Sequence, residues 1–342
     1  MRTLTRSRFL TTFILLGSSL LIGCESSTSQ GGAAGTSTSG TAATPPQPSV
    51  RKIVTTTGMV TDIVRRVVGS HGTVSGLIEA GGDPHLFKPT RGDVKQLYDA
   101  DVVFYSGLKL EGRMSETFEQ LARTGKPVFV VTEKIDAASL RTPPEFEGHH
   151  DPHVWMDVSL WSQCVEQVAE SLAKLDPPHA DEYHQNATAY REELTKLDEY
   201  VKKSIASIPK PQRVLVTAHD AFGYFSQAYG IEVQSVQGVS TESEAGVLDV
   251  NRLVDFLVER KLPAIFVESS VNAKNIQPII EGAASRGVTV RVGGELFSDA
   301  MGNEGTYTGT YIGMIDHNAT LITRALGGDA PEKGLNGKLS AK

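Results

Sequence analysis

Cysteine is nearly absent from this 342-residue chain, which contains only Cys24 and Cys164. Two cysteines cannot build a disulfide framework, and their spacing matches no thiolate zinc motif. Any metal must therefore be bound by histidine and carboxylate side chains. A basic excess is also lacking, because 33 Lys and Arg stand against 40 Asp and Glu, a formal net charge of -7. Without a basic run interleaved with aromatic residues, the composition excludes nucleic-acid binding.

The opening residues 1–23 lack an apolar run long enough for a spanning helix, which needs about 20 residues. A basic start followed by a short apolar run is the layout of a secretory signal peptide. Residues 21–24 read Leu-Ile-Gly-Cys and resemble the bacterial lipobox, which implies lipid attachment at Cys24. The alternative is an ordinary signal peptide with an incidental cysteine. Residues 24–50 then carry no large apolar side chain after Cys24 except Val50, so we expect a flexible tether.

From residue 51 onward, short β-branched runs alternate with amphipathic segments, which predicts parallel α/β structure. The predicted strands are 52–56, 73–77, 102–106 and 127–131, then 213–217, 232–236, 264–268 and 289–292. The predicted helices are 60–68, 93–98, 114–123 and 161–174, then 222–228, 250–260 and 275–285. We therefore expect an N-terminal lobe at 51–177 and a C-terminal lobe at 210–326, each with a small parallel sheet flanked by helices.

Residues 178–209, between the two predicted lobes, carry apolar side chains at steps of three and four. They are Tyr183, Ala187, Tyr190, Leu194, Leu197, Val201 and Ile205. This spacing predicts one long amphipathic helix that joins the lobes rigidly. After the second lobe, residues 327–342 are rich in glycine and lysine, and we expect a disordered tail.

Three of the nine histidines lie in loops that suit ligand binding. His85 and His153 each end an Asp-Pro-His sequence, and His219 ends an apolar strand. The carboxyl ends of parallel strands are where open α/β sheets bind ligands. Three imidazoles need a fourth donor to close a metal site, and Asp299, after the last predicted strand, is the candidate. Two of these histidines come from the predicted N-terminal lobe and one from the C-terminal lobe.

Several stretches together resemble the metal-binding solute receptors of bacterial zinc and manganese ABC importers, the TroA-like family related to ZnuA and PsaA. They are Asp-Pro-His at 83–85, His-Val-Trp-Met-Asp at 153–157, Thr-Ala-His-Asp-Ala-Phe-Gly-Tyr-Phe at 217–225 and Gly-Glu-Leu-Phe-Ser-Asp-Ala-Met-Gly at 294–302. The resemblance runs over about residues 51–326 in the family's order.

This resemblance implies one divalent transition-metal ion, Zn or Mn, as cargo in the cleft between the two lobes, with His85, His153, His219 and Asp299 as its ligands. It further implies an extracytoplasmic monomer, attached to the membrane through lipid on Cys24, that serves a membrane permease and its ATPase. The strongly manganese-typed members of the family have a carboxylate where this chain has His219. Zinc-dedicated members often have a long His-rich loop before the second ligand, whereas this chain has only His149 and His150 there. We therefore expect a site that accepts both metals, with His149 and His150 as exposed neighbours.

Three imidazoles and a carboxylate fill a tetrahedron, which favours capture over catalysis. Asp157 or Asp220 either orients a ligand imidazole or caps a helix. A different class, a secreted zinc hydrolase, would need an open coordination position and a general base, for which Glu242, Glu244 and Glu268 are available. A surface adhesin is a third possibility, for which no sequence feature argues.

Overall fold

The computed structural model describes residues 52–146 and 148–340, so the predicted signal peptide, Cys24 and tether lie outside the described residues. No helix in this described part is both long and apolar enough to cross a bilayer. The strands are β1 Lys52–Thr55, β2 Thr73–Gly76, β3 Val102–Tyr105, β4 Val128–Val130, β5 Val214–His219, β6 Glu232–Gln237, β7 Ala264–Glu268 and β8 Arg291–Leu296. The α-helices are α1 Gly58–Val68, α2 Arg91–Asp99, α3 Ser115–Arg123, α4 Val158–Leu175, α5 Ala180–Ala206, α6 Gly223–Tyr229, α7 Val247–Arg260, α8 Gln277–Ser285 and α9 Tyr311–Ala325.

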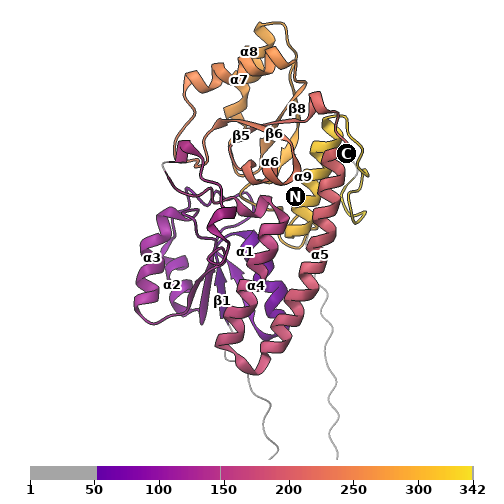
Figure 1. Cartoon of the computed structure of the whole chain (residues 1–342). Coiled ribbons are helices and arrows are strands. Elements are labelled where there is room, and N and C mark those ends of the chain that lie inside the picture. Colours follow the sequence, from indigo (N-terminus) through magenta and orange to yellow (C-terminus); the bar gives the residue numbers. More distant parts are fainter. Residues whose placement is uncertain (1–51, 147, 341–342) are drawn as a thin grey trace, which may run out of the picture. The chain divides into compact units, whose positions relative to one another are not determined.

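The first four strands form one parallel sheet in the order β2-β1-β3-β4. Helices α1, α2 and α3 lie around this sheet (Figure 1). Helix α1 begins directly after β1 because the Thr57 hydroxyl accepts the backbone N–H of Val60, which caps the helix N-terminus. A capping box between Thr90 and Asp93 starts α2 in the same way. The predicted parallel α/β arrangement is confirmed.

The last four strands form two parallel pairs, β5-β6 and β7-β8, and β5 also lies beside β7. Buried residues of β5, β7, α7 and α8 share a core that includes Val216, Ile265, Leu253 and Ile279. Because these strands are parallel, their carboxyl ends lie at one edge. His219 is the last residue of β5 and Glu268 the last residue of β7, so both reach that edge.

Helix α5 is the predicted long helix, with its predicted apolar face buried. Tyr183, Ala187, Tyr190, Leu194, Leu197, Val201 and Ile205 are each at most 2% exposed. The helix packs against α4, α1 and α9, and Figure 1 shows it running alongside α4 and α9. A continuous helix of 27 residues between the two groups of strands is a stiff connection.

Two features differ from the predictions. Helix α9 is absent from the predicted elements because polar residues interrupt its apolar pattern, although Asp316 and Asn318 are fully buried. The second difference is the C-terminal segment, for which we expected disorder. In residues 327–340, the N–H of Leu335 donates to Oδ1 of Asp316 at 2.8 Å, and Leu339 is only 9% exposed. Hydrogen bonds to Asp316, Ser207 and Tyr307 therefore hold a segment whose composition offers few apolar side chains.

Candidate metal centre

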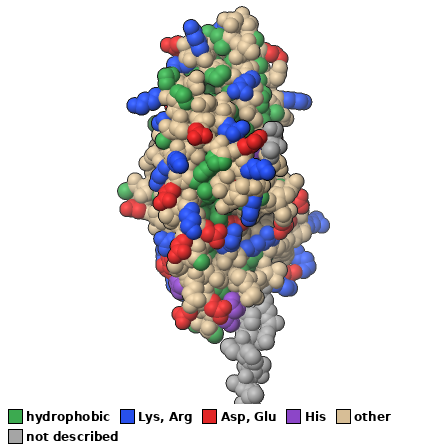
Figure 2. Space-filling view, turned by 90° about the vertical axis from the view of Figure 1, so that its right-hand side faces the viewer, with side chains coloured by type: hydrophobic (Ala, Val, Ile, Leu, Met, Phe, Trp, Pro, Cys, Tyr) green, Lys and Arg blue, Asp and Glu red, His purple; other side chains and the backbone are tan. Residues whose placement is uncertain are grey.

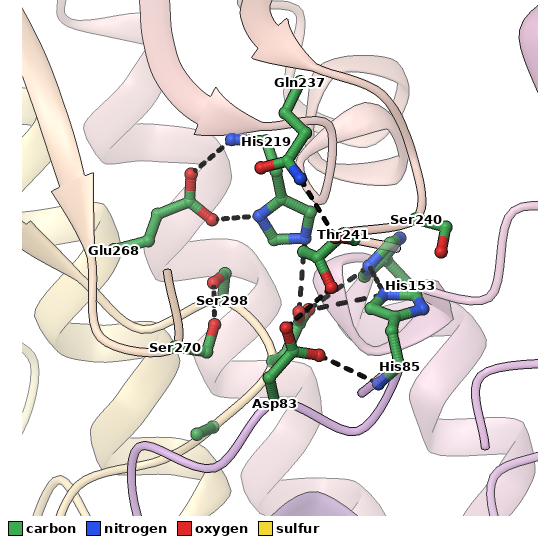
Figure 3. A network of polar contacts seen from close by, with 12 residues as sticks. Asp83, His85, His153, His219, Gln237, Ser240, Thr241, Glu268, Ser270 and Ser298 are labelled. Carbon is green, nitrogen blue, oxygen red and sulfur yellow. Dashed lines mark hydrogen bonds and ion pairs between the residues drawn. The ribbon is translucent and has the colours of Figure 1, made fainter. Parts of the chain in front are cut away.

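Four side chains that are far apart in the sequence converge on one buried point. Their ligand atoms, from His85, His153, His219 and Asp299, all lie within 4.8 Å of one another. His85 comes from the loop between β2 and α2, and His153 precedes a short turn that leads into α4. His219 ends β5, and Asp299 follows β8. None of the four is more than 4% exposed, and Figure 3 shows the three imidazoles turned toward a common centre.

The spacing of the ligand atoms matches a tetrahedral ion. Nε2 of His153 lies 3.2 Å from Oδ1 of Asp299, and Nε2 of His219 lies 3.2 Å from Oδ2. The Nε2 atoms of His85 and His153 are 3.4 Å apart, and Nε2 of His85 lies 3.8 Å from Oδ2 of Asp299. Bonds of about 2.0–2.2 Å to a central ion place neighbouring ligand atoms of a tetrahedron roughly 3.3–3.6 Å apart. The four residues therefore surround a space of the size that one transition-metal ion needs.

Several of these atoms make no hydrogen bond among the described residues. They are both carboxylate oxygens of Asp299 and Nε2 of His219. A buried carboxylate without hydrogen bonds is unfavourable unless a cation compensates its charge. The donor set therefore fits a bound cation, which would satisfy all three atoms at once.

A carboxylate orients the imidazole of His153. Nδ1 of His153 donates to Oδ1 of Asp151 at 2.8 Å, since an ionised carboxylate only accepts. The backbone N–H of His153 donates to the same oxygen at 3.0 Å, and Nη1 of Arg141 donates to the other oxygen at 2.8 Å. With Nδ1 carrying the hydrogen, the neutral ring presents the Nε2 lone pair to the centre.

His219 has an equivalent partner on a neighbouring strand. Oε1 of Glu268 accepts the backbone N–H groups of Ala218 and His219, each at 2.8 Å, while Oε2 accepts Nδ1 of His219. Figure 3 shows Glu268 on the side of His219 away from the other imidazoles. This carboxylate fixes both the position of the strand end and the tautomer of the ring.

His85 is held differently, through its backbone. Oδ1 of Asp83 accepts the N–H of His85 at 2.9 Å and that of Leu86 at 3.4 Å. Among the described residues, no carboxylate contacts the second ring nitrogen of His85. The three imidazoles are therefore not equivalent, because two are fixed at the ring and one through its loop.

Asp299 is positioned by contacts of the preceding residue. The indole N–H of Trp155 donates to the carbonyl of Ser298 at 2.9 Å, and the Ser298 and Ser270 hydroxyls are 2.9 Å apart. The hydroxyl of Tyr311 in turn donates to the carbonyl of Trp155 at 2.7 Å. Trp155 and Tyr311 are fully buried, so the Asp299 loop is tied into the core beside His153.

The electrostatics of the centre differ between the ligands. Burial lowers the pKa of His85 to about 3, against the opposing charge of Asp299. Burial also disfavours charge on His153, but the neighbouring carboxylates of Asp151 and Asp299 outweigh it and raise its pKa to about 9. For His219, burial is likewise outweighed by Glu268 and Asp299, which raise its pKa well above the ordinary value. Burial opposes ionisation of Asp299, yet His219 and His153 hold its pKa well below the ordinary value.

The carboxylates that orient the imidazoles are not the two that the sequence suggested. Asp157 accepts the backbone N–H groups of Ser159 and Leu160 at the start of α4, which is the helix-capping alternative. No hydrogen bond within the described residues joins Asp220 to a ligand imidazole. Asp151 and Glu268 have the orienting role instead.

A sequence signal existed for Asp151 but not for Glu268. Asp151 stands two residues before its histidine, as Asp83 does before His85. Glu268 is brought to His219 only by the adjacency of β7 and β5, which no local pattern reveals. His149 and His150 lie apart from the centre, with His149 near Lys109 and His150 near Thr142.

The fold and the centre define an α/β protein with four buried side chains suited to hold a metal ion, each from a separate chain segment. Residues 53–325 match the family described as zinc-uptake complex component A, periplasmic (ZnuA), and the chain belongs to this family. It is 49% identical to the zinc-binding protein TroA of Treponema pallidum over 274 residues, 80% of this chain and 88% of that protein. It is 46% identical to the manganese-binding lipoprotein MntA of Bacillus subtilis over 276 residues, 80% of this chain and 89% of that protein.

A solved structure shows the same fold. The periplasmic zinc-binding protein TroA from Treponema pallidum superposes with a TM-score of 0.78 at 48% identity, covering 81% of this chain and 99% of that chain. The fold class expected from the sequence and the predicted family are thereby confirmed.

Proposed function

We propose that this protein captures one divalent transition-metal ion, Zn or Mn, outside the cytoplasm and delivers it to the permease and ATPase of an ABC importer. The observation that carries the proposal is the buried group of three imidazoles and one carboxylate at tetrahedral spacing. The printed names of the relatives, zinc-binding for one and manganese-binding for another, support the same two ions as cargo. His85, His153, His219 and Asp299 are the proposed ligands.

The donor set is compatible with both metals. Imidazole nitrogens suit zinc, whereas carboxylate oxygens suit manganese. Asp299 presents one oxygen toward His153 and the other toward His219, so its carboxylate is placed to bind through one oxygen or through both. A second bound oxygen would raise the coordination number above four, which accommodates an ion that prefers more ligands than zinc.

Capture without catalysis is favoured over a zinc hydrolase. A hydrolytic site needs an open coordination position and a free carboxylate as general base. Four protein ligands close the tetrahedron, and Glu268 is already hydrogen-bonded to His219 and the Ala218 N–H. Glu242 pairs with Arg113 at the surface. None of these observations favours a hydrolase, and none favours an adhesin.

The extracytoplasmic, membrane-attached state rests on the opening residues. We propose that Cys24 carries lipid and that residues 24–50 connect it to the folded body, in keeping with the lipoprotein names of relatives. We expect a monomer. The face seen in Figure 2 has acidic and basic side chains interspersed and offers no broad basic field for a nucleic acid.

Metal titration of the full chain in detergent tests the proposal. The chain is stripped with a chelator and titrated with Zn or Mn while the stoichiometry and melting temperature are recorded. We expect one ion per chain, a large rise in melting temperature, and loss of both effects in Asp299→Ala. If neither Zn nor Mn binds, the proposal is refuted. In cells, Cys24→Ala should move the protein from the membrane fraction to the soluble fraction.

A further inference from the structure

The three imidazoles differ in what holds them. Asp151 and Glu268 fix the rings of His153 and His219 directly. His85 depends instead on the conformation of its loop, which Asp83 sets by accepting two backbone N–H groups. Anything that moves Asp83 therefore moves His85 before it moves the other two ligands.

Asp83 is itself held from the opposite side of the centre. The hydroxyl of Thr241 donates to Oδ2 of Asp83 at 2.6 Å, across 158 positions of sequence. Thr241 lies in the loop between β6 and α7, whereas Asp83 lies in the loop between β2 and α2. Figure 3 shows this hydrogen bond next to the imidazoles. It links a loop of the C-terminal strands to the loop that carries His85.

The Thr241 loop is anchored close to His219. Nε2 of Gln237 donates to the carbonyls of Thr241 at 3.1 Å and Ser243 at 2.6 Å. Gln237 is the last residue of β6 and pairs with His219 in the strand register. A continuous series of bonds therefore connects the strand that bears His219 to the loop that bears His85.

This connection is more accessible than the one that Trp155 makes beside Asp299. The Trp155–Ser298 hydrogen bond joins two fully buried residues. By contrast, the Asp83–Thr241 bond is only partly buried, and Leu86, adjacent to His85, is 42% exposed. The Trp155–Ser298 bond cannot break without unpacking the core, whereas the Asp83–Thr241 bond can break near the surface.

We propose that the hydrogen bond between Thr241 and Asp83 is a latch that holds His85 on the bound metal, and that its rupture is the first step of metal release. This inference rests on the proposed function. Once the latch breaks, Asp83 and the His85 loop are free to move away together. His153, His219 and Asp299 keep their own supports, so the ion is left with three ligands and an open side. Thr241 is thus a positioning residue that acts through Asp83.

Two substitutions of Thr241 test the latch. Thr241→Val keeps the branched shape but removes the hydroxyl, whereas Thr241→Ser keeps the hydroxyl. Zn dissociation from the full chain is followed by stopped flow against excess chelator, and association is measured separately. We expect Thr241→Val to release Zn about tenfold faster, because a hydrogen bond to a charged group is lost. The association rate and the melting temperature of the metal-free protein should change little, and Thr241→Ser should release Zn at nearly the wild-type rate.

Glu242→Gln is the matched control. It removes the neighbouring ion pair with Arg113, whose side chains are 34% and 51% exposed, and exposed pairs contribute little. We expect less than about twofold change in Zn release. A Thr241→Val protein that releases Zn at the wild-type rate, or a Thr241→Ser protein as fast as Thr241→Val, would overturn the latch alone. A wild-type chain that takes up no Zn would overturn the proposed function and the latch with it.

Discussion

Oδ1 of Asp151 accepts both the ring Nδ1–H and the backbone N–H of His153, at 2.8 and 3.0 Å. Both residues are fully buried, and Arg141 occupies the second carboxylate oxygen. The ring of His153 therefore cannot rotate without breaking a hydrogen bond in the buried interior. The negative charge of Asp151 also makes the ring a better donor to a metal.

Asp151→Asn should weaken metal binding by about 10- to 100-fold while leaving the protein folded. The asparagine oxygen can take the place of Oδ1 and still accept from His153, so the tautomer is retained. The negative charge is lost, and with it the increased basicity of the imidazole. Competition titration of Zn against a chelator measures the effect.

Asp157→Ala is the matched control, because Asp157 caps α4 and contacts no ligand imidazole. We expect a loss of about 1 kcal/mol in the free energy of unfolding and unchanged Zn affinity. Equal losses of affinity in both variants would mean that Asp151 has no special role.

Glu268→Gln should weaken Zn binding more than Asp151→Asn does. Oε1 of Glu268 accepts two backbone N–H groups, and Oε2 accepts Nδ1 of His219. A glutamine has one oxygen, and if that oxygen serves the backbone, its NH₂ group faces Nδ1. The neutral ring then carries its hydrogen on Nε2, the atom that must bind the metal. Parallel chelator competition on the two variants decides the order, and a smaller loss in Glu268→Gln would contradict it.

His85→Ala should nearly abolish tight binding, since one of four donors is removed from the centre. The double substitution His149→Ala and His150→Ala should change affinity little, because these side chains contact Lys109 and Thr142 instead. Calorimetric titration with Zn and Mn compares the two proteins. Similar losses in both would count against the assigned ligands.

The spacing of apolar residues along the sequence is sufficient to predict the helices and strands whose buried side chains recur at a regular interval. The buried face of α5 from Tyr183 to Ile205 is predictable because apolar side chains recur there at steps of three and four. The strands are predictable because each is a short β-branched run followed by turn or helix residues. Helix α9 was missed because buried polar residues such as Asp316 disrupt its period. The order of the C-terminal segment is not predictable locally, because it comes from hydrogen bonds to distant residues, among them that same aspartate.

The centre was predictable only in part. The Asp-Pro-His loops and the strand end at His219 marked the donors, and the structure brings all three imidazoles together with Asp299. The supports of the ligands depend on contacts between distant segments. Glu268 reaches His219 through strand adjacency, and Thr241 reaches Asp83 across the centre. No local sequence spacing encodes such contacts.

Zn affinity should rise with pH between about pH 7 and pH 9, because metal and protons compete for the same nitrogens. In the metal-free protein the pKa of His153 is raised to about 9 and that of His219 also lies above its ordinary value, so both rings carry protons at neutral pH. His85, with a pKa of about 3, is already neutral and contributes no such dependence. Each proton displaced from a ring by the metal adds about one logarithmic unit of affinity per pH unit, until the pH passes the pKa of that ring. Calorimetry in buffers of different ionisation enthalpy should therefore show proton release at pH 7, and an apparent enthalpy independent of buffer would show that the rings bind metal without losing protons.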